Sequence, residues 1–230
     1  MAKKKQTAGF KWAVPDELGI PPDKLRARLD FYHQAVVLSI YDQEVSSTRV
    51  VSAMDVAHAL ANDLAFGTGL LPSGTIWWRN TRGGPVYAIY VEPKTWKVAL
   101  ELDIKSAPRR FNLPLPGLIF LCSPGKAPWV YAVKKKPTKE TDEVYNAPLC
   151  NIHENGLSCA GTHKYPTRVA DTVQSFFTSF FTASANLKNR SQLYPNNIVR
   201  LWESLDNKKK FPVADLVRIG NLKDLMNMEM

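Results

Sequence analysis

The amino-acid sequence predicts an α+β fold in which an antiparallel β-meander is flanked by helices. Between Thr75 and Val133, apolar residues recur with a period of two in short runs, which is typical of strands in an antiparallel sheet. Glycine and proline clusters separate these runs, and the connections are too short for helical crossovers. On both sides of this region, apolar residues recur at every third or fourth position, which is typical of helices packed on a sheet.

Length and composition predict one globular domain with tails. At 230 residues and 45% hydrophobic content, the chain is long enough to bury a core. We expect a flexible basic arm over residues 1–21, an α+β domain over 22–185, and a C-terminal helical extension over 186–230 that packs on this domain.

The sequence carries no sign of export or of membrane insertion. No apolar segment follows the basic N-terminus, and no run of about 18 apolar residues occurs. The three cysteines are an odd number, which argues for a reducing compartment and for thiols that are free, metal-bound or reactive. These features predict a cytoplasmic protein without a membrane partner.

The elements that precede and form the meander can be placed along the chain. We expect a short helix at 23–30, then a hairpin formed by 35–41 and 48–51. Ser52 is a good N-cap for a helix that ends near Gly67. Within the meander, the apolar runs predict strands at 76–78, 85–91, 96–102, 118–122 and 129–133.

Helices are predicted after the meander. From Pro166 to Phe181, valines and phenylalanines recur at intervals of three and four, so one face of this helix should lie on the sheet. A second helix is expected over 196–205 with Trp202 pointing inward, and a weaker one over 212–226.

Candidate functional residues are concentrated between Cys150 and His163, which hold two of the three cysteines and two of the four histidines. The Asn155-Gly156 pair predicts a chain reversal, because glycine adopts positive φ at little cost. Such a reversal would bring the amide of Asn151 toward the sulfur of Cys159. An amide donor beside a thiol suits thioester chemistry, in which the donor stabilises an oxyanion.

The same stretch leaves three other readings open. Two sulfurs and two imidazoles at these spacings also suit a tetrahedral zinc site, formed by Cys150, His153, Cys159 and His163. Cys159 with His153 or His163 suits a proteolytic cysteine–histidine pair. In the third reading Cys159 is inert and the fold is a binding scaffold.

The charge of the chain favours an acidic partner. Lysine and arginine number 30 against 21 acidic residues, which gives a net charge of +9, and lysine triplets occur at 3–5, 134–136 and 208–210. These triplets are separate and lie in or beside expected loops, so nucleic acid binding through basic loops is one hypothesis and a solvated surface is the other. No standard nucleic-acid-binding motif occurs.

The segment from Pro148 to Cys159, which reads Pro-Leu-Cys-Asn-Ile-His-Glu-Asn-Gly-Leu-Ser-Cys, resembles the active-site segment of ubiquitin-conjugating (UBC) enzymes. There, a His-Pro-Asn tripeptide precedes a glycine-containing turn and the catalytic cysteine. The interval from Asn151 to Cys159 agrees, although Leu149 and Cys150 stand in place of the histidine and proline. Together with Ile76 to Trp78 and the phenylalanine-rich 176–182, the segment more closely resembles the bacterial PRTRC system protein B family.

The resemblance implies a UBC-like fold, here with an extra N-terminal hairpin and C-terminal helices. It implies that Cys159 accepts a ubiquitin-like modifier as a thioester from a ThiF-type activating enzyme, and that Asn151 stabilises the oxyanion during transfer to an amine. His153 and His163 are candidate proton carriers. A small ubiquitin-like protein and a JAB-type peptidase are the implied partners, and no cofactor is expected.

A second functional hypothesis comes from a different class. The chain would be a basic, zinc-stabilised adaptor of a plasmid maintenance system that binds nucleic acid without catalysis. It would then hold zinc through Cys150, His153, Cys159 and His163, and its affinity for nucleic acid would fall steeply with salt.

Overall fold

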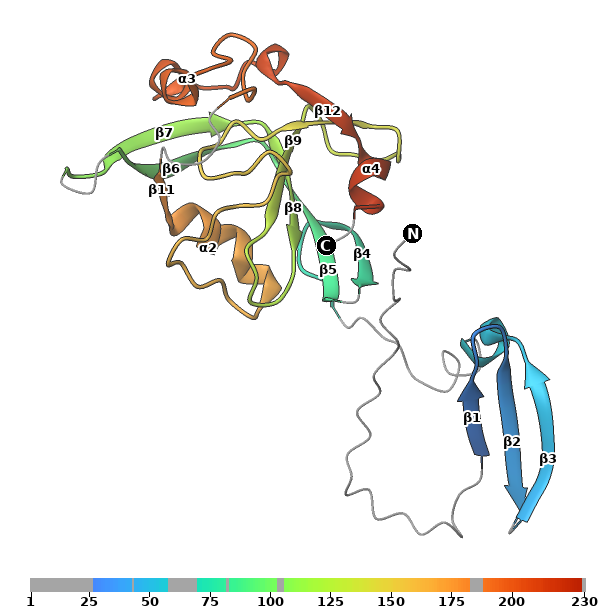
Figure 1. The fold of residues 1–230 in the computed structure, drawn as a ribbon. Coiled ribbons are helices and arrows are strands. Elements are labelled where there is room, and N and C mark those ends of the chain that lie inside the picture. Colours follow the sequence, from blue (N-terminus) through green and yellow to red (C-terminus); the bar gives the residue numbers. More distant parts are fainter. Residues whose placement is uncertain are drawn as a thin grey trace, which may run out of the picture. The chain divides into compact units, whose positions relative to one another are not determined.

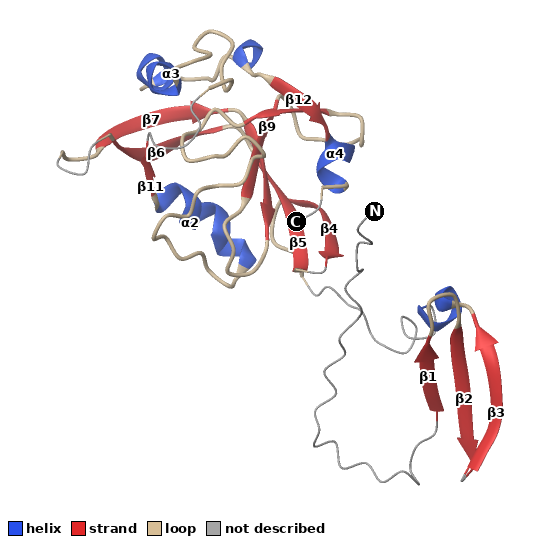
Figure 2. Ribbon diagram, in the orientation of Figure 1, coloured by secondary structure: helices blue, strands red, loops and turns tan. Residues whose placement is uncertain are grey.

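The structure is a computed structural model that describes residues 27–42, 44–57, 70–81, 83–102, 106–182 and 188–228. The chain divides into two compact units, Met1–Gly69 and Leu70–Met230 (Figure 1). Both units are rich in strands and have few helices, as Figure 2 shows. The predicted α+β class is confirmed.

The first unit contains a three-stranded antiparallel sheet of β1 (Ala27–Phe31), β2 (Val36–Asp42) and β3 (Glu44–Val51). The predicted hairpin is therefore present as β2 and β3. The helix predicted for 23–30 is wrong at residues 27–30, which form strand β1. Residues 53–57 are helical and follow Ser52, whose hydroxyl accepts a hydrogen bond from the backbone N–H of Met54. The rest of that expected helix, and the expected arm at 1–21, lie outside the described residues.

The second unit contains a six-stranded sheet with neighbouring strands antiparallel, in the order β12-β10-β9-β8-β5-β4. Its strands are β4 (Thr75–Thr81), β5 (Gly84–Val91), β8 (Gly117–Cys122), β9 (Trp129–Val133), β10 (Glu143–Asn146) and β12 (Arg218–Asn221). Every residue of β8 is buried, because side chains from both of its faces lie in core clusters. This burial explains the uninterrupted apolar run at 118–122.

The expected single meander is interrupted between β5 and β8. Strands β6 (Lys94–Glu101) and β7 (Arg109–Leu115) form a separate antiparallel ribbon, and β5 pairs with β8 instead of β6. A short strand, β11 (Phe180–Thr182), pairs with β6 in parallel and completes this second sheet. In the ribbon, the inward side chains of Trp96, Val98 and Phe111 are buried, whereas Lys97 and Arg110 are exposed.

Helices cover the ribbon and the end of the larger sheet. Helix α2 (Thr172–Thr178) follows a 3₁₀ turn, η2 (Val169–Asp171), and packs on β6, where the Phe177 ring stacks on Trp96. Helix α3 (Ile198–Leu205) packs on β7. The inward Trp202 predicted there is confirmed, with a side chain that is fully buried.

Two of the expected helices are shorter in the structure. The helix predicted for residues 166–181 ends at Thr178, because the chain becomes extended at Ser179 and enters β11. Residues 212–226 are not one helix: they contain a 3₁₀ turn, η3 (Val213–Asp215), then β12, then α4 (Leu222–Met226). The C-terminal region therefore adds a strand to the six-stranded sheet as well as helices.

Candidate active site

The stretch that begins at Asn151 folds back on itself. The backbone N–H of Cys159 donates a hydrogen bond of 2.7 Å to the carbonyl oxygen of Asn151. Ile152 and Ser158 form an antiparallel bridge, and the N–H of His153 donates to the carbonyl oxygen of Leu157. The predicted reversal at Asn155-Gly156 is confirmed, and it brings the backbones of Asn151 and Cys159 together.

Gly156 fixes the geometry of this turn. Its φ is +87°, which is in the left-handed region, and its backbone N–H donates to the carbonyl oxygen of His153. A Cβ at this position would lie 2.4 Å from the ring of Tyr131. The Tyr131 hydroxyl donates a 2.6 Å hydrogen bond to the carbonyl oxygen of Asn155. The turn therefore sits directly on a buried tyrosine of β9, and only glycine fits there.

The carboxamide of Asn151 is oriented by β11. Its Oδ1 accepts hydrogen bonds from the backbone N–H of Thr182 at 3.1 Å and from the Thr182 hydroxyl at 2.7 Å. Asn151 is buried, and its φ of 59° is one that asparagine tolerates better than most residues. Because the oxygen faces Thr182, the amino group occupies the other end of the same planar carboxamide.

The three cysteines differ in accessibility. Cys122 and Cys150 are fully buried, whereas Cys159 is partly exposed. Burial raises the pKa of Cys122 to about 12. It also raises the pKa of Cys150 to about 12, with the nearby charge of Arg190 acting in the opposite direction. Since the thiolate is the nucleophile, the two buried thiols are poorly suited to chemistry near neutral pH.

The two histidines of the stretch have different surroundings. His153 is exposed, next to the turn. His163 is partly buried, its Nε2 lies 2.8 Å from the Ser175 hydroxyl, and its ring meets that of Tyr165 edge to face. The pKa of Tyr165 is raised, mainly by burial and also by the charges of Cys122 and Cys159. His163 and Tyr165 therefore form part of the polar surroundings of the Cys159 segment.

Two side chains from the C-terminal region hold the segment on both sides of Asn151. The buried guanidinium of Arg190 donates to the carbonyl oxygens of Ala147, Ile152 and His153. The indole N–H of Trp202 donates a 3.0 Å hydrogen bond to the carbonyl oxygen of Pro148. Burial lowers the pKa of Arg190 to about 10, which leaves it charged at neutral pH.

Sequence patterns did not predict the contacts that Arg190, Thr182 and Trp202 make with this segment. Arg190 lies between the helices predicted for 166–181 and 196–205, and no local feature marks it as buried. Thr182 directly follows the helix predicted for 166–181, and no local pattern predicts the strand that it belongs to, so its contact with Asn151 was also missed. Of these three residues, only Trp202 was predicted to be buried, and its hydrogen bond to Pro148 was not predicted.

The histidines and cysteines of the stretch do not converge on one point. Among the residues that the structure describes, no three histidine, cysteine, aspartate or glutamate side chains form a group that could hold a metal ion. Cys150, His153, Cys159 and His163 all belong to this described part. The arrangement thus lends no support to the zinc reading.

A comparison with protein families identifies one relationship. The family model described as prokaryotic E2 family D matches residues 52–219, which is most of the chain. The chain belongs to prokaryotic E2 family D. Searches of curated proteins and of solved structures each gave no match.

E2 proteins are ubiquitin-conjugating enzymes, so membership of prokaryotic E2 family D places the chain among conjugating-enzyme-like transferases and implies an E1-like activating partner in general terms. The match includes the whole of the segment from Ala147 to His163 and the three residues Thr182, Arg190 and Trp202 that bond to it. The sheet β1–β3 lies outside the match. None of the helices in the described ranges is long and apolar enough to span a membrane.

Proposed function

We propose that this protein accepts a ubiquitin-like modifier as a thioester on Cys159 from a ThiF-type activating enzyme and passes it to an amine. The observation that carries the proposal is the pairing of Cys159 with Asn151. Cys159 is the partly exposed cysteine of the three, and its backbone N–H bonds the carbonyl oxygen of Asn151. The carboxamide oxygen of Asn151 is in turn held by Thr182. Membership of the E2 family supports the same assignment.

Loading begins with a thiol exchange. The thiolate of Cys159 attacks the carbonyl carbon of the modifier's thioester on the activating enzyme. A new carbon–sulfur bond forms at Cys159, the bond to the activating enzyme's sulfur breaks, and that sulfur leaves as a thiolate. Such exchange between similar thiols requires little driving force.

Transfer needs more help from the protein. An amine attacks the thioester carbonyl and the oxygen becomes an oxyanion, which the amino group of Asn151 stabilises by donating a hydrogen bond. The tetrahedral intermediate then collapses, so that the carbonyl double bond re-forms and the carbon–sulfur bond breaks. The sulfur of Cys159 leaves as a thiolate, and the ammonium proton passes to a base. His163 is our candidate for that base, because it is partly buried beside the segment.

The finer identity is also a proposal. We assign the chain to the PRTRC system protein B branch on the resemblance of its Pro148 to Cys159 segment, and with it a small ubiquitin-like protein and a JAB-type peptidase as partners. Arg190 and Trp202 would keep that segment in place during both steps.

The test is a loading assay with a ThiF-type activating enzyme and a small ubiquitin-like protein from the same organism, together with ATP. The wild type should form an adduct that thiol reductants release. Cys159→Ser should form either an adduct that resists reductants or no adduct, and Cys159→Ala should form none. Cys150→Ala is the matched control and should load. An adduct that survives Cys159→Ala, or no adduct on the wild type while the activating enzyme charges itself, rules the proposal out.

The role of Asn151 has a separate readout. Asn151→Ala should still load but should discharge to free lysine roughly a hundredfold more slowly, which is the usual effect of losing an oxyanion donor. Discharge at the wild-type rate rules out that role and leaves the loading of Cys159 intact.

A further inference from the structure

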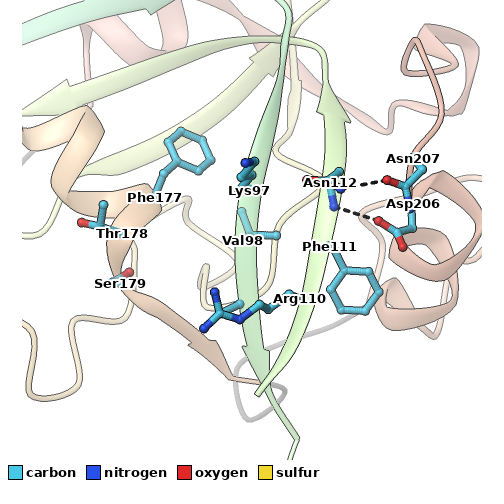
Figure 3. A pocket seen from close by; sticks show the side chains of 11 residues that line it. Lys97, Val98, Arg110, Phe111, Asn112, Phe177, Thr178, Ser179, Asp206 and Asn207 are labelled. Atoms are coloured by element: carbon cyan, nitrogen blue, oxygen red, sulfur yellow. Dashed lines mark hydrogen bonds between the residues drawn. The ribbon is translucent and has the colours of Figure 1, made fainter. Parts of the chain in front are cut away.

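A cleft of about 630 Å³ lies over the outward face of the β6–β7 ribbon (Figure 3). Lys97 of β6 and Arg110 and Asn112 of β7 contribute side chains to its lining. Residues 177–179 at the end of α2 line one side, and residues 206–207 after α3 line the other. The cleft is separate from the cysteines of the chain, since none of them lines it.

Two cations share the floor of this cleft. In the strand register Lys97 is opposite Asn112, so Lys97 and Arg110 are diagonal neighbours, with Cα atoms about 7–8 Å apart. Both side chains are exposed on the same face of the ribbon. Like charges at this spacing repel each other, so an anion bound between them would be favoured.

No carboxylate of the described residues lies within salt-bridge distance of either cation. Neither Lys97 nor Arg110 takes part in a salt bridge within the described ranges, whereas the adjacent Arg109 pairs with Glu203 at 2.7 Å. One acidic residue, Asp206, lines the cleft, and its Oδ1 already accepts the backbone N–H of Asn112. The lysines at 208–210, which are exposed, directly follow the lining residues 206–207 in the chain.

The edge of β7 favours a peptide as the occupant. The backbone N–H of Asn112 donates to Asp206 and its carbonyl oxygen accepts from Asn207, so both groups face away from β6. By strand alternation the N–H and carbonyl of Arg110 face the same way, and the described part of the chain provides no hydrogen-bond partner for them there. An extended peptide can pair with such an edge.

Nucleic acid fits the cleft less well. Bases bind non-specifically by stacking on exposed aromatic rings. The two aromatic rings of the cleft, Phe111 and Phe177, are buried, and Phe177 is already stacked on Trp96.

We propose that this cleft binds an extended acidic peptide segment of a partner protein, with its carboxylates beside Lys97 and Arg110 and its backbone along the edge of β7. The site goes beyond the proposed thioester chemistry and does not depend on it. A Cys159→Ala protein should bind such a peptide as well as the wild type does.

The probe is a fluorescein-labelled ten-residue peptide of alternating glutamate and threonine, which favours a strand and places its carboxylates on one side. Binding is followed by fluorescence anisotropy with the full chain. Lys97→Gln/Arg110→Gln should weaken binding about tenfold or more, because two charge-assisted contacts are lost. Lys136→Gln/Arg200→Gln removes the same residue types at exposed positions outside the cleft and should bind within about twofold of wild type.

Each of the following three outcomes would overturn the proposal. Equal losses in the two double variants would mean that net charge alone attracts the peptide. Equal binding of a control peptide with glutamine for glutamate would exclude recognition of carboxylates. Tighter binding of a labelled single-stranded oligonucleotide, lost on substitution of Lys97 and Arg110, would assign the cleft to nucleic acid. Thermal unfolding of each variant confirms that it is folded.

Discussion

The guanidinium of Arg190 donates a hydrogen bond of 2.9 Å to the backbone carbonyl oxygen of His153, across 37 residues of sequence. The same guanidinium also bonds the carbonyls of Ala147 and Ile152, and it is buried. One side chain therefore ties together both ends of the segment that carries Asn151.

Replacing Arg190 should loosen this segment. Arg190→Met leaves three carbonyl oxygens without their donor, and we expect it to lower the free energy of unfolding by about 2–4 kcal/mol. Arg190→Lys should have a free energy of unfolding between those of the wild type and Arg190→Met, because an ammonium keeps the charge but lacks the planar fork of donors. Urea denaturation measures both. Arg200→Met is the control, since Arg200 is exposed on α3, and a loss at Arg190 no larger than at Arg200 would contradict the assignment.

Gly156 can be tested against a second glycine. Gly156→Ala combines a left-handed φ with a Cβ placed against the Tyr131 ring, and it should cost about 2–4 kcal/mol of stability. Gly161 has a φ of +53°, and a Cβ there meets no atom within 4 Å, so Gly161→Ala should cost only about 1 kcal/mol. Thermal or urea denaturation compares the two. Similar costs at both positions would mean that the turn does not press on Tyr131.

The hydroxyl of Thr182 should matter for transfer more than for loading. Thr182→Val removes the 2.7 Å hydrogen bond to Oδ1 of Asn151 but keeps the backbone N–H bond and the shape of the side chain. If Asn151 acts as proposed, losing about 1 kcal/mol of its orientation should slow discharge to free lysine roughly fivefold. Thr182→Ser retains the hydroxyl and should discharge at close to the wild-type rate. Slower loading with unchanged discharge would argue against this positioning role.

Local patterns were enough to predict the parts of the fold that local chemistry controls. The strands β5, β8 and β9 follow from apolar runs between turn residues, and the fold-back before Cys159 follows from Asn155-Gly156. In each case the neighbouring residues alone favour one backbone conformation.

Pairing between distant strands was not predictable in the same way. Nothing within β6 specifies β7 rather than β5 as its partner, because that choice depends on which apolar faces meet in the core. The same holds for Phe180–Thr182, where apolar residues that continue the helical spacing of α2 instead form a strand beside β6. Arg190 lies in a polar stretch between two predicted helices, and only the folded chain shows that its guanidinium donates hydrogen bonds to backbone carbonyl oxygens.

The three cysteines should react with thiol reagents in two classes. At pH 8 one thiol per chain should react rapidly, and mass spectrometry should assign it to Cys159, the partly exposed cysteine. Cys122 and Cys150 should react only after unfolding in denaturant, because both are fully buried and burial raises the pKa of each thiol to about 12. Cys159→Ala should abolish the fast class, and fast labelling of Cys150 in the native protein would contradict the structure.

Stability should fall as the pH rises above about 9. The folded-state pKa values of Cys122 and Cys150 are about 12, and the ordinary value is 9.0. Between these values the unfolded chain loses protons that the folded chain keeps, so unfolding becomes easier. From pH 9 to pH 10 the loss should be about 1 kcal/mol for each cysteine. Urea denaturation measures the free energy of unfolding at each pH. In Cys122→Ala/Cys150→Ala this free energy should fall by about 2 kcal/mol less between pH 9 and pH 10 than in the wild type. Val130→Ala, which removes buried atoms but no ionisable group, should keep the full slope, and equal slopes in the two variants would refute the assignment to these thiols.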